Sequence, residues 1–205
     1  MERSDADDLN TLMDSVTISE ALRELLSLST ADQDKLISLI SAEIASELID
    51  EAPPELAGML IERQETAKAV EIFDELDSNV QADVLAELDE EDADAILAGI
   101  DPVDAASVRR LAEYDAGTAG GLMVADAFTF RPNQTVGAVL RSLASDDEDL
   151  ERYDGQHPYI IDEDDRPLGV VSLRGLLTAK RSARLDDIMI TPMTVNASAS
   201  LDELQ

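Results

Sequence analysis

Carboxylates are the side chains of this sequence that are best suited to do chemistry. The 205 residues include 46 Asp and Glu against 15 Lys and Arg, which gives a formal net charge of −31. A dense carboxylate surface attracts hard divalent cations such as Mg²⁺ or Ca²⁺, which prefer oxygen ligands. Adaptation to high salt would produce the same acidity, because a charged surface keeps a protein soluble. Acidity alone therefore does not locate a metal site, and both interpretations stay open.

Other chemistries have little support in the residues present. The chain has no Cys, which excludes disulfides and thiolate ligands, and its only histidine, His157, precedes Pro158 and is expected to be structural. The glycines of residues 117–121 lack the Lys-Ser/Thr of a phosphate-binding loop, and Asp162–Asp165 lacks the Gly and distant Glu of an EF-hand. We expect no enzyme activity. The negative charge also argues against nucleic acid as a partner, because that needs a basic surface.

Short helices are the elements expected to position the carboxylates of the first half. Residues 1–14 are polar and aperiodic, which predicts a disordered acidic terminus. Apolar residues at helical spacing predict one helix over residues 17–27 and another over residues 30–48. Pro53-Pro54 then ends this pattern and can open the next helix. The inner side of that helix is expected to carry Leu56, Met59, Leu60 and Ile61.

A short repeat follows these helices. The pairs Leu76-Asp77, Leu88-Asp89 and Ile100-Asp101 recur every 12 residues. Each Asp suits a helix N-cap, where its oxygen accepts free backbone N–H groups and its charge meets the positive end of the helix. Helices this short cannot bury an apolar stripe alone, so they must stack on one another. We therefore predict a superhelix of short helices over residues 15–113.

The pattern changes after a glycine-rich junction at residues 114–126. Three glycines within residues 117–121 do not suit a helix interior, because each costs about 1 kcal/mol against Ala. Residues 127–184 then predict the order β-α-β-β-α, with strands at 127–130, 159–161 and 168–171. An acidic loop is expected at residues 145–154.

A second copy of this pattern is expected to start within residues 185–205. Residues 188–195 predict its first strand, and Ser198 or Ser200 is expected to cap its first helix. A unit that stops after its first helix has no complete core, so we expect the chain to be a piece of a longer protein. The expected fold is thus a mainly α superhelix, followed by one α/β (α+β) module and the start of another.

This succession resembles the cytosolic region of the MgtE-type magnesium transporters, in which an acidic superhelical N-domain precedes a pair of CBS modules and a membrane domain. The resemblance covers nearly the whole chain from about residue 17. The segments that carry it are Ala67–Glu71, Tyr114 with Ala119–Met123, Pro158–Asp162, Leu168–Arg174, Ile188-Met189 and Pro192.

The resemblance implies a magnesium sensor without enzyme activity. In that family, Mg²⁺ bridges carboxylates of the N-domain, the CBS modules and a connecting helix, and this holds a gate closed. When Mg²⁺ is scarce, repulsion between the acidic faces swings the N-domain away. The implied partners are Mg²⁺, a transmembrane domain outside this chain and a second copy paired through the CBS modules, at the cytoplasmic face of the cell membrane. Mn²⁺ or Co²⁺ could replace Mg²⁺, because oxygen ligands discriminate poorly.

The resemblance also implies particular site residues. Glu71 and Asp92 match N-domain positions that contact Mg²⁺, Glu91 matches almost as well as Asp92, and the backbone carbonyl of Gly120 or Gly121 is a third candidate ligand. A solvated helix face or a helix-end charge would explain both Glu71 and Asp92 without a metal.

CBS modules often bind adenine nucleotides through an aspartate after the third strand. Here Ser172-Leu173-Arg174 leads to Gly175, so that aspartate is missing. Tyr159 and Arg174 are the remaining nucleotide-binding candidates, and core packing or surface charge explains them equally well. The sequence therefore argues against nucleotide binding. The alternative to the transporter region is a soluble CBS-domain sensor without a membrane domain, whose acidity reflects salt adaptation.

Overall fold

The computed structural model describes residues 9–11, 13, 16–125, 127–144 and 157–204, and the chain divides into two compact units. The first, which we call the helical unit, comprises Met1–Ala125 together with Ala197–Gln205. The second, the sheet unit, comprises Asp126–Asn196. The last nine residues therefore pack with the helices rather than with the module that precedes them in the sequence.

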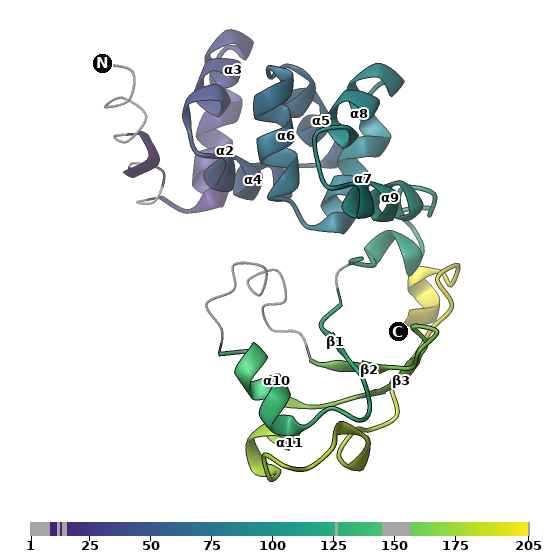
Figure 1. Ribbon diagram of the computed structural model, residues 1–205. Coiled ribbons are helices and arrows are strands. Elements are labelled where there is room, and N and C mark those ends of the chain that lie inside the picture. Colours follow the sequence, from purple (N-terminus) through teal and green to yellow (C-terminus); the bar gives the residue numbers. More distant parts are fainter. Residues whose placement is uncertain (1–8, 12, 14–15, 126, 145–156, 205) are drawn as a thin grey trace. The chain divides into compact units, whose positions relative to one another are not determined.

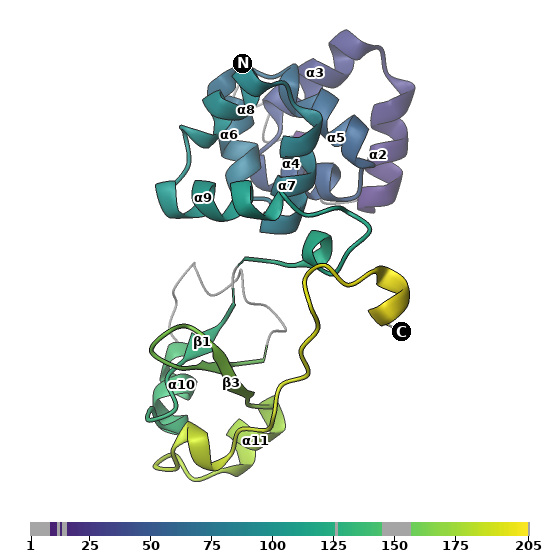
Figure 2. The ribbon, with the colours of Figure 1, turned by 90° about the vertical axis from the view of Figure 1, so that its right-hand side faces the viewer.

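The helical unit is a superhelix of short helices, as the sequence predicts (Figures 1 and 2). Each helix packs against the next but one: α2 on α4, α4 on α6 and α6 on α8, and likewise α3 on α5, α5 on α7 and α7 on α9. Their bounds are α2 Ile18–Ser27, α3 Thr30–Leu39, α4 Ala42–Asp50, α5 Pro54–Glu62, α6 Thr66–Asp74, α7 Ser78–Glu87, α8 Glu90–Leu97 and α9 Pro102–Leu111.

Short polar side chains start most of these helices. Thr17 forms a capping box with Glu20, and Ser29 accepts a hydrogen bond from the N–H of Asp32. In the 12-residue repeat, the side chains of Asp89 and Asp101 accept backbone N–H bonds as expected. Asp77 is the N-cap residue of α7 as predicted, but its side chain does not make the capping hydrogen bond that was expected.

Two other expectations for this unit need correction. The single helix expected over residues 30–48 is two helices, because the Ser41 hydroxyl accepts the N–H of Ile44 (3.2 Å) and starts α4. Apolar spacing continues across this break and hides it. On α5, Met59 is 48% exposed, whereas Ala57 and Gly58 face the core. The expected disorder of residues 1–14 falls mostly outside the described residues; residues 9–11 and 13 are helical, and Met13 is buried.

The core of the helical unit is aliphatic and tightly packed. Phe73 on α6 is fully buried, and so are Leu48, Leu60 and Ile72. The buried amide of Gln81 donates to the carbonyl of Phe73 (2.6 Å), which satisfies a polar group that would otherwise be costly inside the core.

The sheet unit has the predicted order β-α-β-β-α. Strand β1 pairs in parallel with β2, which pairs antiparallel with β3, and the partners are Thr129 with Tyr159 and Ile160 with Gly169. The elements are β1 Thr129–Phe130, α10 Val136–Ser142, β2 Tyr159–Ile161, β3 Pro167–Val170 and α11 Leu173–Thr178. The acidic loop expected at residues 145–154 lies outside the described residues.

The core of this unit is small. It comprises Phe128, Val136, Val139, Ile160, Val171, Leu176 and Leu185.

The strand expected over residues 188–195 does not form. Only Ile190 pairs, in an isolated bridge with Val170 that has two hydrogen bonds of 3.0 and 2.9 Å. Pro192, two residues further on, has no N–H to donate to the edge strand β3, so the pairing stops at this one bridge. Ser200 does precede a helical turn, the 3₁₀ helix η4 (Leu201–Leu204).

Across the described residues, no helix is both long enough and apolar enough to cross a membrane.

The contact at Gly58 leads to a prediction on stability. A Cβ at this position would lie 2.7 Å from the Cβ of Glu87 on α7, too close for two carbons. We expect Gly58→Ala to lower the free energy of unfolding by about 1 kcal/mol, because overpacking of 1–3 kcal/mol outweighs the roughly 1 kcal/mol that Ala gains in a helix. Urea unfolding followed by circular dichroism measures this. Ser38→Ala, on the exposed side of α3, is the control: it gains helix propensity without a core contact and loses only the local hydrogen bond from its hydroxyl to the carbonyl of Lys35. A stabilised Gly58→Ala protein would contradict the contact.

Candidate metal centre

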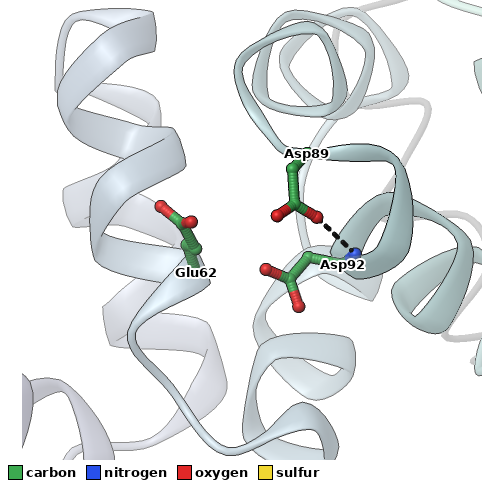
Figure 3. Close-up of side chains that lie close together, drawn as sticks. All are labelled: Glu62, Asp89 and Asp92. Atoms are coloured by element: carbon green, nitrogen blue, oxygen red, sulfur yellow. Dashed lines mark hydrogen bonds between the residues drawn. The ribbon is translucent and has the colours of Figure 1, made fainter.

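Three carboxylates from two parts of the superhelix converge on one point. Glu62, Asp89 and Asp92 each place an oxygen so that the three atoms lie within 4.8 Å of one another (Figure 3). Glu62 and Asp89 are exposed and Asp92 is half-buried. We call this set the carboxylate group.

The packing of α5 on α7 brings these residues together. Gly58 lets α5 approach the end of α7 at Glu87, two residues before Asp89, and Glu62 lies one helical turn beyond Gly58. Asp89 is the N-cap of α8, and Asp92 is in the first turn of that helix. One helix–helix contact and one cap therefore fix the geometry of the site.

The cap leaves one oxygen of Asp89 available to a cation. The N–H groups of Glu91 (3.1 Å) and Asp92 (3.0 Å) both donate to Oδ1 of Asp89. A cation can therefore approach Oδ2 without displacing these bonds.

Local structure explains two of the three acids but not the third. Asp89 and Asp92 lie at the positive N-terminal end of α8, where a carboxylate is favourable without any metal. Glu62 is the last residue of α5, whose last turn holds no basic residue, and a negative charge at this end of a helix is unfavourable. Asp50, Asp74 and Glu87 end their helices in the same way, so what distinguishes Glu62 is its convergence with the two acids of α8.

The nearby arginines pair with other acids. Arg63, the neighbour of Glu62, forms a half-buried ion pair with Asp34 (2.7 Å). Arg109 contacts α8 at Asp94 (2.9 Å). Among the described residues no ion pair involves the carboxylate group, and three oxygens at this spacing suit Mg²⁺, which binds few carboxylates and keeps several waters.

Only one of the N-domain carboxylates named from the sequence belongs to this group. Asp92 is a member, and Glu91 contributes its backbone N–H to Asp89 while its side chain is exposed. Glu71 is exposed on α6. Burial lowers the pKa of the nearby Lys68 amine, and the charge of Glu71 opposes part of this effect. Glu62 was missed altogether from the sequence, and Asp89 was assigned there only as a cap. An acid at the last position of a helix does not single out Glu62, because α4, α6 and α7 also end in an acid.

The two junction glycines are explained by close packing. A Cβ on Gly120 would lie 2.4 Å from the ring of Tyr114, and one on Gly121 would lie 2.7 Å from Cα of Ala116. Gly120 starts the 3₁₀ helix η1 (Gly120–Leu122), and its carbonyl accepts the N–H of Met123 (3.2 Å). Neither glycine is part of the carboxylate group.

The nucleotide candidates lie in the sheet unit. Tyr159 on β2 is 39% exposed, and Arg174 is exposed on α11. Gly175, which stands where the nucleotide-binding aspartate is missing, donates its N–H to the Ser172 hydroxyl that caps α11 (3.0 Å).

A second group of acids lines a hollow of about 190 Å³ between the end of α4 and the turn before α7. Asp50, Glu75 and Asp77 contribute to it. Burial, then the charges of Asp77 and Glu51, raise the pKa of Asp50 above its ordinary value. Asp50 is therefore easier to protonate in the folded state than in the unfolded chain.

This shift predicts a pH-dependent stability. Because the folded pKa of Asp50 is raised, its contribution is most favourable below the unfolded value of 3.8 and is lost as pH rises through the folded pKa. We expect Asp50→Asn to increase the free energy of unfolding at pH 7 by up to about 0.5 kcal/mol, with the gain shrinking toward pH 4. Thermal unfolding across this range measures it. Asp74→Asn, at the last position of α6 but outside the hollow, is the matched control; an equal gain in both variants would contradict the role of the hollow.

Comparison with known protein families gives two matches that together cover most of the chain. The family model of the MgtE intracellular N domain matches residues 6–117, and that of the CBS domain matches residues 119–182. Among curated proteins, the magnesium transporter MgtE of Thermus thermophilus is 37% identical over 98 residues, which are 48% of this chain and 21% of that protein. The matched part thus spans about a fifth of the relative's length.

Two solved structures have the same arrangement of elements. One is the cytosolic domain of the Mg²⁺ channel MgtE in complex with ATP, with a TM-score of 0.81 and 27% identity over 95% of this chain and 79% of that one. The other is the soluble part of a magnesium transporter, with a TM-score of 0.80 and 20% identity over 98% and 79% of the two chains. The second likeness shows the fold alone.

Proposed function

This chain belongs to the family of the MgtE intracellular N domain, and we propose that it is the Mg²⁺-sensing regulatory region of a magnesium transporter or channel. In this proposal the chain binds Mg²⁺ through carboxylates and gates a pore formed by a membrane domain of the same protein. The region acts at the cytoplasmic face of the membrane and is not an enzyme. Two copies pair through their CBS modules.

The observation that carries the proposal is the position of Glu62. Capping and helix-end charge account for Asp89 and Asp92, but Glu62 is placed against both its own helix end and two other acids. Two unit charges about 4 Å apart repel by about 1 kcal/mol even in bulk water. A divalent cation at the group would turn this repulsion into attraction.

This electrostatic balance provides a switch. Without Mg²⁺, the carboxylate group repels any other acidic surface that approaches it. With Mg²⁺ bound, the octahedral ion still has positions held by water, and these can be exchanged for carboxylates of another segment. In the family, such carboxylates belong to the second CBS module and the connecting helix. The ion would then hold the N-domain against those segments and keep the gate closed.

The finer assignments follow the same proposal. We assign residues 15–113 to the N-domain, 114–126 to the junction, 127–184 to the first CBS module and 185–205 to the start of the second. Glu71, Glu91 and the carbonyls of Gly120 and Gly121 remain proposed ligands in states where other segments complete the site. Mn²⁺ and Co²⁺ are proposed as alternative ions, because all the ligands are oxygens.

A soluble CBS-domain sensor adapted to high salt is the second candidate. The observation in its favour is that acids occur in every segment of a chain with a net charge of −31. This candidate predicts stabilisation by any salt of equal ionic strength, with no preference for Mg²⁺.

The two candidates differ in a Mg²⁺ titration. We expect millimolar MgCl₂, at an ionic strength held constant with NaCl, to raise the melting temperature, because an ion that binds only the folded state stabilises it by mass action. Glu62→Gln should weaken the apparent affinity at least about tenfold, since it removes one of the three ligands. The same variant should melt higher than the parent protein without Mg²⁺, because it relieves charge repulsion.

Glu24→Gln, on α2, is the matched control for this titration. It also removes one exposed glutamate charge from a short helix of the same unit, but it lies outside the carboxylate group. An equal loss of affinity in both variants would reject the carboxylate group as the site. An equal rise in melting temperature with MgCl₂ and with matched NaCl would reject Mg²⁺ sensing and favour salt adaptation.

A further inference from the structure

The glycine-rich junction is held by the last residues of the chain. Thr118 pairs with Ser200 in an antiparallel bridge, and the N–H groups of Ala119 and Gly120 donate to the carbonyls of Ala199 (2.8 Å) and Ala197 (2.7 Å). In both Figure 1 and Figure 2 the two segments lie side by side, and both belong to the helical unit. We call this pairing the junction clasp.

A second bridge of the same form exists in the sheet unit. Thr135 pairs with Arg184, and the N–H groups of Leu185 and Asp186 donate to the carbonyls of Gln134 (3.0 Å) and Pro132 (3.1 Å). We call this pairing the internal clasp.

The two clasps match atom for atom. Residues 132, 134 and 135 correspond to 197, 199 and 200, an offset of 65, and residues 118, 119 and 120 correspond to 184, 185 and 186, an offset of 66. Each bridge also has a third hydrogen bond in the equivalent place, from Leu201 to Gly117 (3.3 Å) and from Val136 to Ala183 (3.0 Å).

The surroundings of the clasps match as well. In each clasp the segment that donates the N–H groups leads into a 3₁₀ turn, η1 (Gly120–Leu122) in the junction clasp and η3 (Leu185–Asp187) in the internal clasp. In each clasp the segment whose carbonyls accept these bonds is followed by a helix, η4 after Ser200 and α10 after Thr135. Residues 197–201, which belong to the expected second repeat, thus pair with residues 117–120 of the junction that precedes the first module.

We infer that the junction clasp is a coupling device, through which the second repeat sets the conformation of the junction and of the helix that the junction contacts. The junction is fixed to the superhelix at its far end, because the buried Ser78 hydroxyl at the start of α7 accepts the N–H of Ala125 (2.7 Å). At its near end, Tyr114 packs on Gly120, which is itself a donor in the clasp. Gly120 and Ala125 are five residues apart, so a movement of residues 197–201 is transmitted to the first turn of α7 through this short segment.

Cysteine pairs test the clasp directly, because the chain has no cysteine of its own. Residues 118 and 200 are a non-hydrogen-bonded antiparallel pair, in which Cα atoms lie about 4.5 Å apart, within the range that a disulfide needs. Residues 135 and 184 have the same geometry and provide the matched control. We expect Thr118→Cys/Ser200→Cys and Thr135→Cys/Arg184→Cys to form intramolecular disulfides at similar rates under mild oxidation, seen as faster-migrating monomers on a non-reducing gel. Closure of the control pair alone would overturn the junction clasp.

Hydrogen exchange on the unmodified chain tests the clasp without any substitution. The amides of Ala119 and Gly120 should be protected to a similar extent as those of Leu185 and Asp186. Fast exchange at 119 and 120 alongside protection at 185 and 186 would overturn the clasp even if neither cysteine pair closed.

Hydrogen exchange on the oxidised cysteine variant tests the coupling. The disulfide between positions 118 and 200 should slow exchange at Ala125 and in the first turn of α7 by at least about tenfold relative to its reduced form, whereas the control disulfide should leave them unchanged. Equal rates in the oxidised and reduced forms would overturn the coupling and leave the clasp as a local pairing. Neither readout depends on Mg²⁺, so each can fail independently of the proposed function.

Discussion

Repulsion between carboxylates is the constraint that shapes this protein. A chain with a net charge of −31 folds only if its acids are spread over the surface or placed where the backbone favours them. Some of them meet that condition at the starts of helices, where Asp89 and Asp101 accept backbone N–H groups and Asp32 lies in the first turn of α3. Glu62 and Asp50, each at the end of its helix and close to other acids, do not. A cation that binds where the fold holds such acids together relieves the most electrostatic repulsion.

The superhelix makes this tolerance possible. Each helix is too short to be stable alone, and its stability comes from aliphatic contacts with the next helix but one. Those contacts fix helix ends relative to one another, including the end of α5 against the start of α8. The cost of bringing charges together is thus offset by packing elsewhere, and the charge can remain unneutralised until an ion arrives.

Much of the fold, but little of the site, could be predicted from the sequence. Helix starts were predictable at Pro53-Pro54 and Asp101 because caps and proline act locally, and the order β-α-β-β-α followed from apolar patterns within short segments. The break at Ser41 was hidden because apolar spacing continues across it. Glu62 was not predictable as a partner of Asp89, because their proximity depends on how α5 packs at Gly58, which is a property of tertiary structure. The pairing of residues 197–201 with the junction was missed for the same reason, since a bridge between residues about 80 positions apart leaves no local signal.

The central claim is that Glu62, Asp89 and Asp92 bind a divalent cation, and crystals grown with Mn²⁺ in place of Mg²⁺ test it most directly. Mn²⁺ is also satisfied by oxygen ligands, and its anomalous scattering locates it without reference to the surrounding density. The account predicts an anomalous peak about 2.1 Å from an oxygen of at least two of these carboxylates. Anomalous peaks elsewhere on the acidic surface, with none at this group, would contradict it.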